Sequence, residues 1–231
     1  MKYNENNKKY NINQNYFSEW SNNMAYILGF VYADGNLDKN KYRLRISSID
    51  KDILEEINNE FESDRDIRLE SNSIGEWYTL VVDNRQIYSD LIKLGVTPNK
   101  SKTCNIPNIP KNLIYDFLRG VFDGDGCVYG KHHKDSSIPT LSIDIATASN
   151  KFKDSFLKLT NDIVDDKHNF TIQTRKNGLN IIRANTTVSE RFYNKIYYEG
   201  CMHLKRKKNK FDEILNQRKN RKKKLPKSHK V

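Results

Sequence analysis

The sequence has few of the residues that would tie it to a membrane, a secretory route or a zinc module. Its three cysteines lie far apart with no C-x-x-C pair, which suits a reducing compartment and argues against structural zinc. No apolar run approaches the roughly 18 residues of a membrane span. The polar, Asn-rich N-terminus has no secretory signal. We therefore expect an intracellular, cytoplasmic protein without a membrane partner.

Excess charge is absent from most of the chain. The net charge is +11, yet residues 1–204 hold 27 basic and 27 acidic residues, while residues 205–231 hold 13 basic and 2 acidic ones. Such a run is usually a flexible arm drawn to polyanions, and we expect a basic C-terminal helix or tail over 205–231. This run favours a nucleic-acid partner; a merely solvated tail is the alternative.

Proline is also scarce, and its placement divides the chain. Three of the five prolines lie in residues 97–112, where proline cannot continue a helix or a central strand, so we expect an extended linker. It separates two segments of similar length, 24–96 and 113–204, which follow a polar extension over 1–23. This arrangement indicates an internal repeat.

The two segments repeat one order of predicted secondary structure. Each opens with an apolar stretch that ends in Asp-Gly and continues through two strands, an amphipathic helix, two more strands and a closing helix. The amphipathic helices are expected over 51–63 and 150–164, after Asp50 and Ser149 as N-caps. An αββαββα order in each half predicts an α+β fold with antiparallel sheets.

One predicted strand has an unusual charge pattern. Lys41, Arg43 and Arg45 alternate with Tyr, Leu and Ile, so the three bases share one strand face. Like charges on one face repel each other unless a polyanion lies across them. Residues 50–66, in contrast, carry eight acids against two bases. We expect a basic sheet surface and an acidic outer helix; an ordinary amphipathic strand is the alternative.

Two nine-residue segments, ILGFVYADG and LRGVFDGDG, carry the candidate chemistry. Both have glycine third, an acid eighth and glycine ninth. Glycine inside a helix costs about 1 kcal/mol relative to alanine, and is tolerated where another backbone comes very close. If the two helices pack at Gly29 and Gly120, their ends bring Asp34 and Asp125 side by side.

Two neighbouring carboxylates repel each other unless a cation lies between them. Their oxygens suit a hard divalent ion such as Mg²⁺ or Mn²⁺, and the helix-terminal carbonyls of Ala33 and Gly124 would add oxygen ligands. Such a metal can polarise a phosphodiester, activate water and stabilise the leaving oxygen. Either motif alone could be a simple helix-to-strand turn, but two copies at matched positions of a repeat favour a metal site.

These residues resemble the LAGLIDADG homing endonucleases, whose namesake nonapeptide is matched at 27–35 and 118–126. The resemblance covers 24–204. It implies a monomer of two αββαββα halves about a pseudo-twofold axis, with the motif helices at the interface and the sheets forming a saddle over double-stranded DNA. It also implies that Asp34 and Asp125 are the metal-binding catalytic acids. The family makes a staggered double-strand cut in a long target site, with one metal-activated water per strand.

The chain departs from the family pattern at two places. Tyr32 stands where the family has its first Asp, whereas the second motif keeps Asp123; neither position is the metal ligand. Family members also commonly place a lysine near each active site from a strand end, and here the ends of the second strands have none. The candidates for this basic helper are Arg85, Arg183, Lys51 and Lys151.

We therefore expect a Mg²⁺-dependent, site-specific DNA endonuclease of a mobile genetic element, intron-encoded or freestanding. Self-splicing is not expected, because the chain lacks a first-residue Cys or Ser and a terminal His-Asn. The alternative is a maturase-like RNA-binding protein or a DNA-binding regulator that uses the same saddle without cleavage; the two retained acids favour the nuclease. A ribosome-associated basic protein would agree with the tail alone. The residues expected to face DNA are Lys39, Lys41, Arg43, Arg45, Arg68, Gln173 and Arg175.

Overall fold

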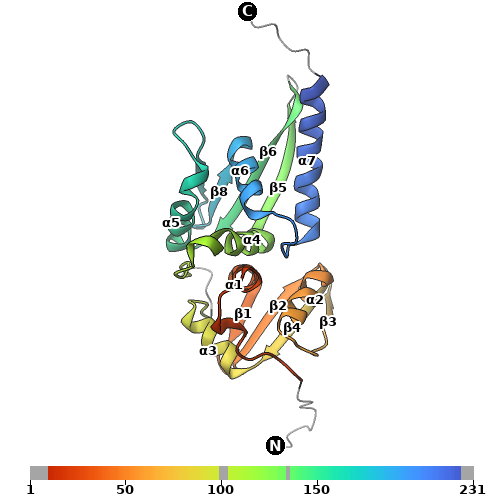
Figure 1. The fold of residues 1–231 in the computed structure, drawn as a ribbon, viewed down its shortest axis with the longest axis vertical. Helices are drawn as coiled ribbons and strands as arrows, with labels where there is room; N and C mark the ends of the chain where they lie inside the picture. Colours follow the sequence, from red (N-terminus) through yellow and green to blue (C-terminus); the bar gives the residue numbers. More distant parts are fainter. Residues whose placement is uncertain (1–9, 99–103, 134–135, 225–231) are drawn as a thin grey trace, which may run out of the picture.

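The computed structural model describes residues 10–98, 104–133 and 136–224, and in it the chain forms two similar halves stacked end to end (Figure 1). Parts of the expected N-terminal extension, linker and tail lie outside the described residues, namely 1–9, 99–103 and 225–231.

The predicted αββαββα order is confirmed in both halves. The first half contains α1 (Asn22–Asp34), β1 (Gly35–Asp38), β2 (Arg43–Ser48), α2 (Lys51–Glu60), β3 (Arg68–Asn72), β4 (Gly75–Asp83) and α3 (Arg85–Lys93). The second half contains α4 (Ile114–Asp125), β5 (Gly126–His133), β6 (Ser136–Thr147), α5 (Asn150–Leu159), β7 (Phe170–Thr174), β8 (Asn180–Ala184) and α6 (Thr186–Ile196). A further helix, α7 (Lys205–Lys224), follows the repeats.

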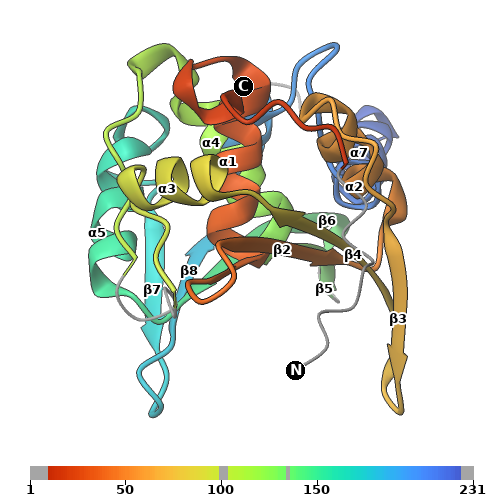
Figure 2. The same ribbon diagram turned by 90° about the horizontal axis from the view of Figure 1, so that it is seen from below.

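Each half has a four-stranded antiparallel sheet, and the strand orders β1-β2-β4-β3 and β5-β6-β8-β7 correspond. Because side chains alternate along a strand, Leu44 and Ile46 of β2 are buried while the arginines beside them stay partly exposed. Seen from below, the β3–β4 and β7–β8 hairpins extend in the same direction from opposite sides of the molecule (Figure 2). The expected α+β fold with antiparallel sheets is thus confirmed.

Helices α1 and α4 pack against each other at the boundary between the halves (Figure 1). The hydroxyl of Ser21 caps α1 by accepting a hydrogen bond of 3.0 Å from the Met24 amide. Every residue from Met24 to Tyr32 is buried, because α1 meets its own sheet on one side and α4 on the other. This helix is therefore apolar all round, as expected for a helix inside a core.

Two segments outside the repeats also join the core. Cys104, Ile106 and Ile109 are buried, so the proline-containing linker packs against the protein. The basic run over 205–224 is a helix rather than a flexible arm, and it packs on β5 and β6 with Phe211 and Ile214 buried. Within the described ranges, no helix combines the length and the apolar character needed to cross a membrane.

Candidate active site

The motif glycines lie where the two central helices touch. A Cβ atom added at Gly29 would lie 2.0 Å from the Phe117 carbonyl oxygen, and one added at Gly120 would lie 2.0 Å from the Tyr26 carbonyl oxygen. The contact is therefore made by backbone on both sides. A side chain at either position would force α1 and α4 apart.

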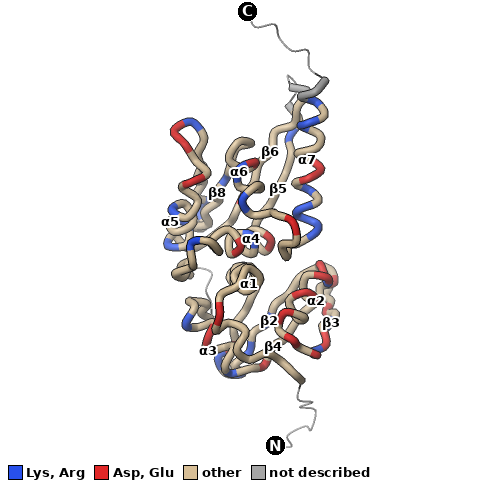
Figure 3. The backbone as a smooth tube through the Cα atoms, in the orientation of Figure 1, with Lys and Arg blue, Asp and Glu red and all other residues tan. Residues whose placement is uncertain are grey.

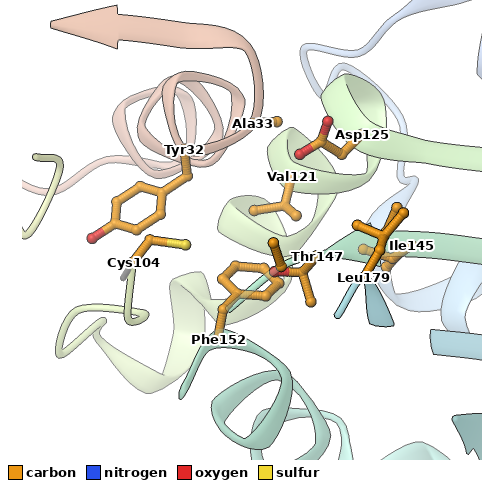
Figure 4. Close-up of a pocket in the computed structure, with 11 residues that line it drawn as sticks. Tyr32, Ala33, Cys104, Val121, Asp125, Ile145, Thr147, Phe152 and Leu179 are labelled. Carbon is orange, nitrogen blue, oxygen red and sulfur yellow. The ribbon is translucent and has the colours of Figure 1, made fainter. Parts of the chain in front are cut away.

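The same packing brings the carboxyl ends of the two helices together. Asp34 is the last residue of α1 and Asp125 the last of α4. A Cβ atom added at Gly124 would lie 2.2 Å from the Ala33 Cβ and 3.3 Å from Asp34 Oδ2, so the Asp34 carboxylate lies beside Gly124. Figure 4 shows the Asp125 carboxylate next to Ala33.

Two pockets of similar size flank this meeting point. The Asp125 pocket, of about 260 Å³, is lined by Asp125, Ala33 and Thr147, among others. The Asp34 pocket, of about 250 Å³, is lined by Asp34, Gly124, Ser47, Ser48, Ile49, Trp77 and Arg206, among others. Each pocket combines the acid of one motif with the residue that precedes the acid in the other motif. Each is therefore a composite of both halves.

The oxygen atoms gathered here suit a hard divalent ion. Carboxylates and helix-terminal carbonyls are ligands that suit Mg²⁺ and Mn²⁺. The lack of a side chain at Gly124 leaves room for the Ala33 Cβ, with the Asp34 carboxylate close beside it. Across the described residues, no group of three or more His, Cys, Asp or Glu side chains could hold a metal. Backbone carbonyls, water or a substrate phosphate would therefore have to complete the coordination.

A buried lysine that sequence reasoning missed reaches the same place from α7. Lys207 Nζ donates hydrogen bonds to the carbonyl oxygens of Gly124 at 2.7 Å and Phe122 at 2.9 Å. Burial lowers the pKa of Lys207, whereas the charges of Asp123, Asp34 and Asp125 act in the opposite direction.

The signal for Lys207 is present in the helical phase of the tail. The buried residues of α7, together with Leu204 just before it, are spaced three and four apart, as on one face of a helix: Leu204, Lys207, Phe211, Ile214 and Arg218. A lysine on that stripe lies toward the core. A total of the basic residues over 205–231 does not distinguish it from the exposed ones.

Asp123, the second acid of motif two, belongs to a buried hydrogen-bond network. Its carboxylate accepts from the Tyr26 hydroxyl at 3.0 Å, the Tyr197 hydroxyl at 2.7 Å and the Leu204 amide at 2.7 Å. Burial raises the pKa of Asp123, and these three donors act in the opposite direction. Asp123 thereby links α1, the end of α6 and the start of α7.

The four candidates for the basic helper all lie outside the two pockets as far as the described residues define them. Arg85 stacks over the Tyr42 ring with its guanidinium carbon 4.4 Å from the centroid, and Arg183 pairs with Asp144 at 2.6 Å. Lys51 pairs with Glu55 at 2.7 Å, and Lys151 lies exposed on α5.

Each arginine of β2 is paired with an acid of another strand of the same sheet. The expectation that these like charges repel each other unless a polyanion lies across them is therefore wrong. Arg43 pairs with Asp83 of β4 at 2.5 Å, and Arg45 pairs with Glu70 of β3 at 3.1 Å. These acids are brought beside the arginines by the strand register. The other residues expected to face DNA are exposed: Lys39, Lys41, Arg68, Gln173 and Arg175.

The acids at and around α2 face the basic start of α7. Arg206 pairs with Asp50 at 3.0 Å, and Lys205 pairs with Asp52 at 3.0 Å. Figure 3 shows acidic residues around α2 and β3 and basic residues along α7. The predicted acidic helix is therefore partly neutralised by the start of α7.

Comparison with known proteins gives one family match and several structural ones. Residues 112–197 match the family model of the LAGLIDADG-like domain. The homing endonuclease I-WcaI bound to its DNA recognition sequence is similar, with a TM-score of 0.54 and 17% identity over 84% of this chain and 91% of that one. The I-LtrWI LAGLIDADG homing endonuclease bound to target DNA gives a TM-score of 0.56 and 16% identity over 92% of both chains.

A third similar structure is the N-terminal LAGLIDADG domain of DUF199/WhiA, with a TM-score of 0.52 and 16% identity over 87% of this chain and 88% of that one. No curated protein sequence matches this chain. At such identities the similarity establishes the fold. That fold is shared by proteins named as homing endonucleases and by one that is not so named.

Proposed function

Because the chain has the LAGLIDADG fold and a LAGLIDADG-like domain in its second half, as its two motifs predicted, we propose that it is a metal-dependent, site-specific double-strand DNA endonuclease. The observation that carries this proposal is the composite construction of the two pockets, each joining the acid of one motif to the residue that precedes the acid in the other motif. A single chain would then supply one pocket for each DNA strand.

Asp34 and Asp125 would hold Mg²⁺ or Mn²⁺, with the carbonyls of Ala33 and Gly124 as further ligands. When bound, such an ion polarises the phosphodiester and activates water. Hydroxyls lie at equivalent strand ends beside the two acids, Ser48 in the Asp34 pocket and Thr147 in the Asp125 pocket. These hydroxyls would donate hydrogen bonds to a phosphate oxygen and so orient the scissile group.

Double-stranded DNA would lie across the two sheets, between the β3–β4 and β7–β8 hairpins (Figure 2). Exposed Arg68, Gln173 and Arg175 on or beside these hairpins would contact it. Arg43 and Arg45 would approach it while held by Asp83 and Glu70. An arginine that is already oriented loses less conformational freedom on binding a base edge.

The test selects bound duplexes from a randomised DNA library and then incubates them with Mg²⁺, Mn²⁺ or EDTA. We expect metal-dependent double-strand cleavage. Because a metal ligand contributes several kcal/mol, Asp34→Asn and Asp125→Asn should each slow cleavage by about a thousandfold or more. The matched control is Asp154→Asn, which removes a carboxylate that is 71% exposed on α5 and should leave cleavage unchanged.

Full activity in both motif variants would show that the acids are misassigned. Specific binding without cleavage under any metal condition would favour a second candidate, a non-cleaving DNA- or RNA-binding protein. Two observations favour this candidate: the likeness to the DUF199/WhiA domain, and the hydrogen bond that Lys207 donates to the Gly124 carbonyl oxygen.

A further inference from the structure

The two composite pockets differ in the basic side chains around them, and the Asp34 pocket also has a second acid, Asp123, in its lining. Lys207 places its ammonium group 2.7 Å from the Gly124 carbonyl oxygen, and Gly124 lines the Asp34 pocket. Arg206 of the same helix also lines that pocket. The described residues that line the Asp125 pocket include no lysine or arginine. The asymmetry comes from α7, which has no counterpart among the described residues of the first half.

Lys207 lies at the carboxyl end of α4, where the partial charge of the helix attracts cations. The last carbonyls of α4 carry the negative partial charge of the helix end, and Lys207 satisfies two of them, those of Phe122 and Gly124. Its residue is only 7% exposed, so solvent screens its charge little. A divalent ion held by Asp34 and the Gly124 carbonyl would be a close neighbour of this ammonium group, and the two like charges would repel.

We infer that Lys207 is a fixed cation that competes with the divalent metal in the Asp34 pocket, so that the protein binds metal tightly beside Asp125 and weakly beside Asp34. The inference rests on the proposed function, because it concerns the same two pockets. Its consequence is that the two DNA strands are not cut equally fast, and that the strand at the Asp125 pocket is cut first.

A simpler role for Lys207 is that of a helix cap for α4. The two roles give different results when Lys207 is replaced by methionine, which keeps the length of the side chain and removes the charge. A lost cap lowers the stability of the protein and leaves metal affinity as it was. A lost competitor raises metal affinity in the Asp34 pocket.

The experiment titrates the full chain with Mn²⁺ and measures the free ion by its EPR signal. Wild-type protein should show one tighter and one weaker site. In Lys207→Met we expect the weaker site to tighten by about tenfold or more, because a like charge a few ångströms away has been removed. Lys207→Arg, which keeps the charge, should resemble the wild type. The matched control is Lys205→Met, which removes an exposed positive charge from the same turn of α7.

Second substitutions locate the effect. Adding Asp34→Asn to Lys207→Met should abolish the gain, whereas adding Asp125→Asn should preserve it. If Lys207→Met does not fold, the single substitutions at Asp125 and Asp34 still test the inference. With Lys207 in place, Asp125→Asn should remove the tighter site and Asp34→Asn should spare it.

Equal Mn²⁺ affinities in folded Lys207→Met and wild type would overturn the inference and leave the proposed function standing. Loss of the tighter site in Asp34→Asn instead of Asp125→Asn would also overturn it. If neither wild type nor Lys207→Met binds Mn²⁺, the inference fails, whereas the proposed function is decided by the cleavage assay, in which a DNA phosphate can complete the coordination. The two failures are therefore distinguishable.

Discussion

Replacing Gly120 by alanine perturbs the contact on which the whole site depends. The new Cβ would lie 2.0 Å from the Tyr26 carbonyl oxygen and 2.7 Å from the Phe30 amide nitrogen. These are backbone atoms of α1, which cannot rotate away as a flexible side chain can. The two helices must therefore separate by about 1 Å or more before an ordinary contact distance is reached.

The magnitude follows from two opposing effects. Overpacking a core costs about 1–3 kcal/mol and occasionally more, and a clash with backbone falls at the upper end of that range. The higher helix propensity of alanine offsets about 1 kcal/mol of this cost. We expect Gly120→Ala to lower the free energy of unfolding by about 2 kcal/mol, and Gly29→Ala to do the same because its clash with Phe117 is equally short.

Urea unfolding followed by circular dichroism measures this change as a lower midpoint at an unchanged slope. The matched control is Gly75→Ala, since nothing lies within 4 Å of a Cβ added there. Mn²⁺ affinity supplies a second readout, because separating the helices also separates Asp34 from Gly124. Wild-type stability and metal affinity in Gly120→Ala would refute the argument that glycine is required for the close approach.

Two further predictions concern the surface of the protein. Asp165 accepts a hydrogen bond of 2.8 Å from Arg191, which, with donors from His168 and Lys167, lowers the pKa of Asp165 in the folded state despite some desolvation. Asp165→Asn should therefore be less stable than wild type at neutral pH, and thermal melts should show the difference shrinking as the pH falls below about 4. Deleting residues 219–231, which keeps Arg218 in its buried place, should weaken binding to all DNA sequences alike and make the salt dependence shallower. A changed target preference in a binding assay would contradict the second prediction.

The repeat made much of the fold predictable from sequence. Two copies of an apolar segment with glycine third and an acid eighth indicated paired helices, and alternation identified strands such as β2. These signals are local, so a single sequence contains them. The length of β6 and the extent of α7 were less accessible, because they depend on which elements pack together.

The site was less predictable where it depends on residues distant in sequence. Glu70 neutralises Arg45 because β3 and β4 bring it there, and the strand pattern around Arg45 does not contain that information. Lys207 reaches Gly124 from 83 residues away, on a helix outside the repeat. A search for a helper among the strand ends could not have found it.

The hydrogen bond between Tyr26 and Asp123 makes the two halves of the chain complementary rather than equivalent. In the repeat, Tyr26 corresponds to Phe117, and Asp123 corresponds to Tyr32. A homodimer of two second halves would leave each buried Asp123 without its partner's hydroxyl, and a homodimer of two first halves would have no carboxylate for either Tyr26. The two halves are thus complementary in the way that the subunits of a heterodimer are. Neither half could be doubled or exchanged without loss of the buried bond.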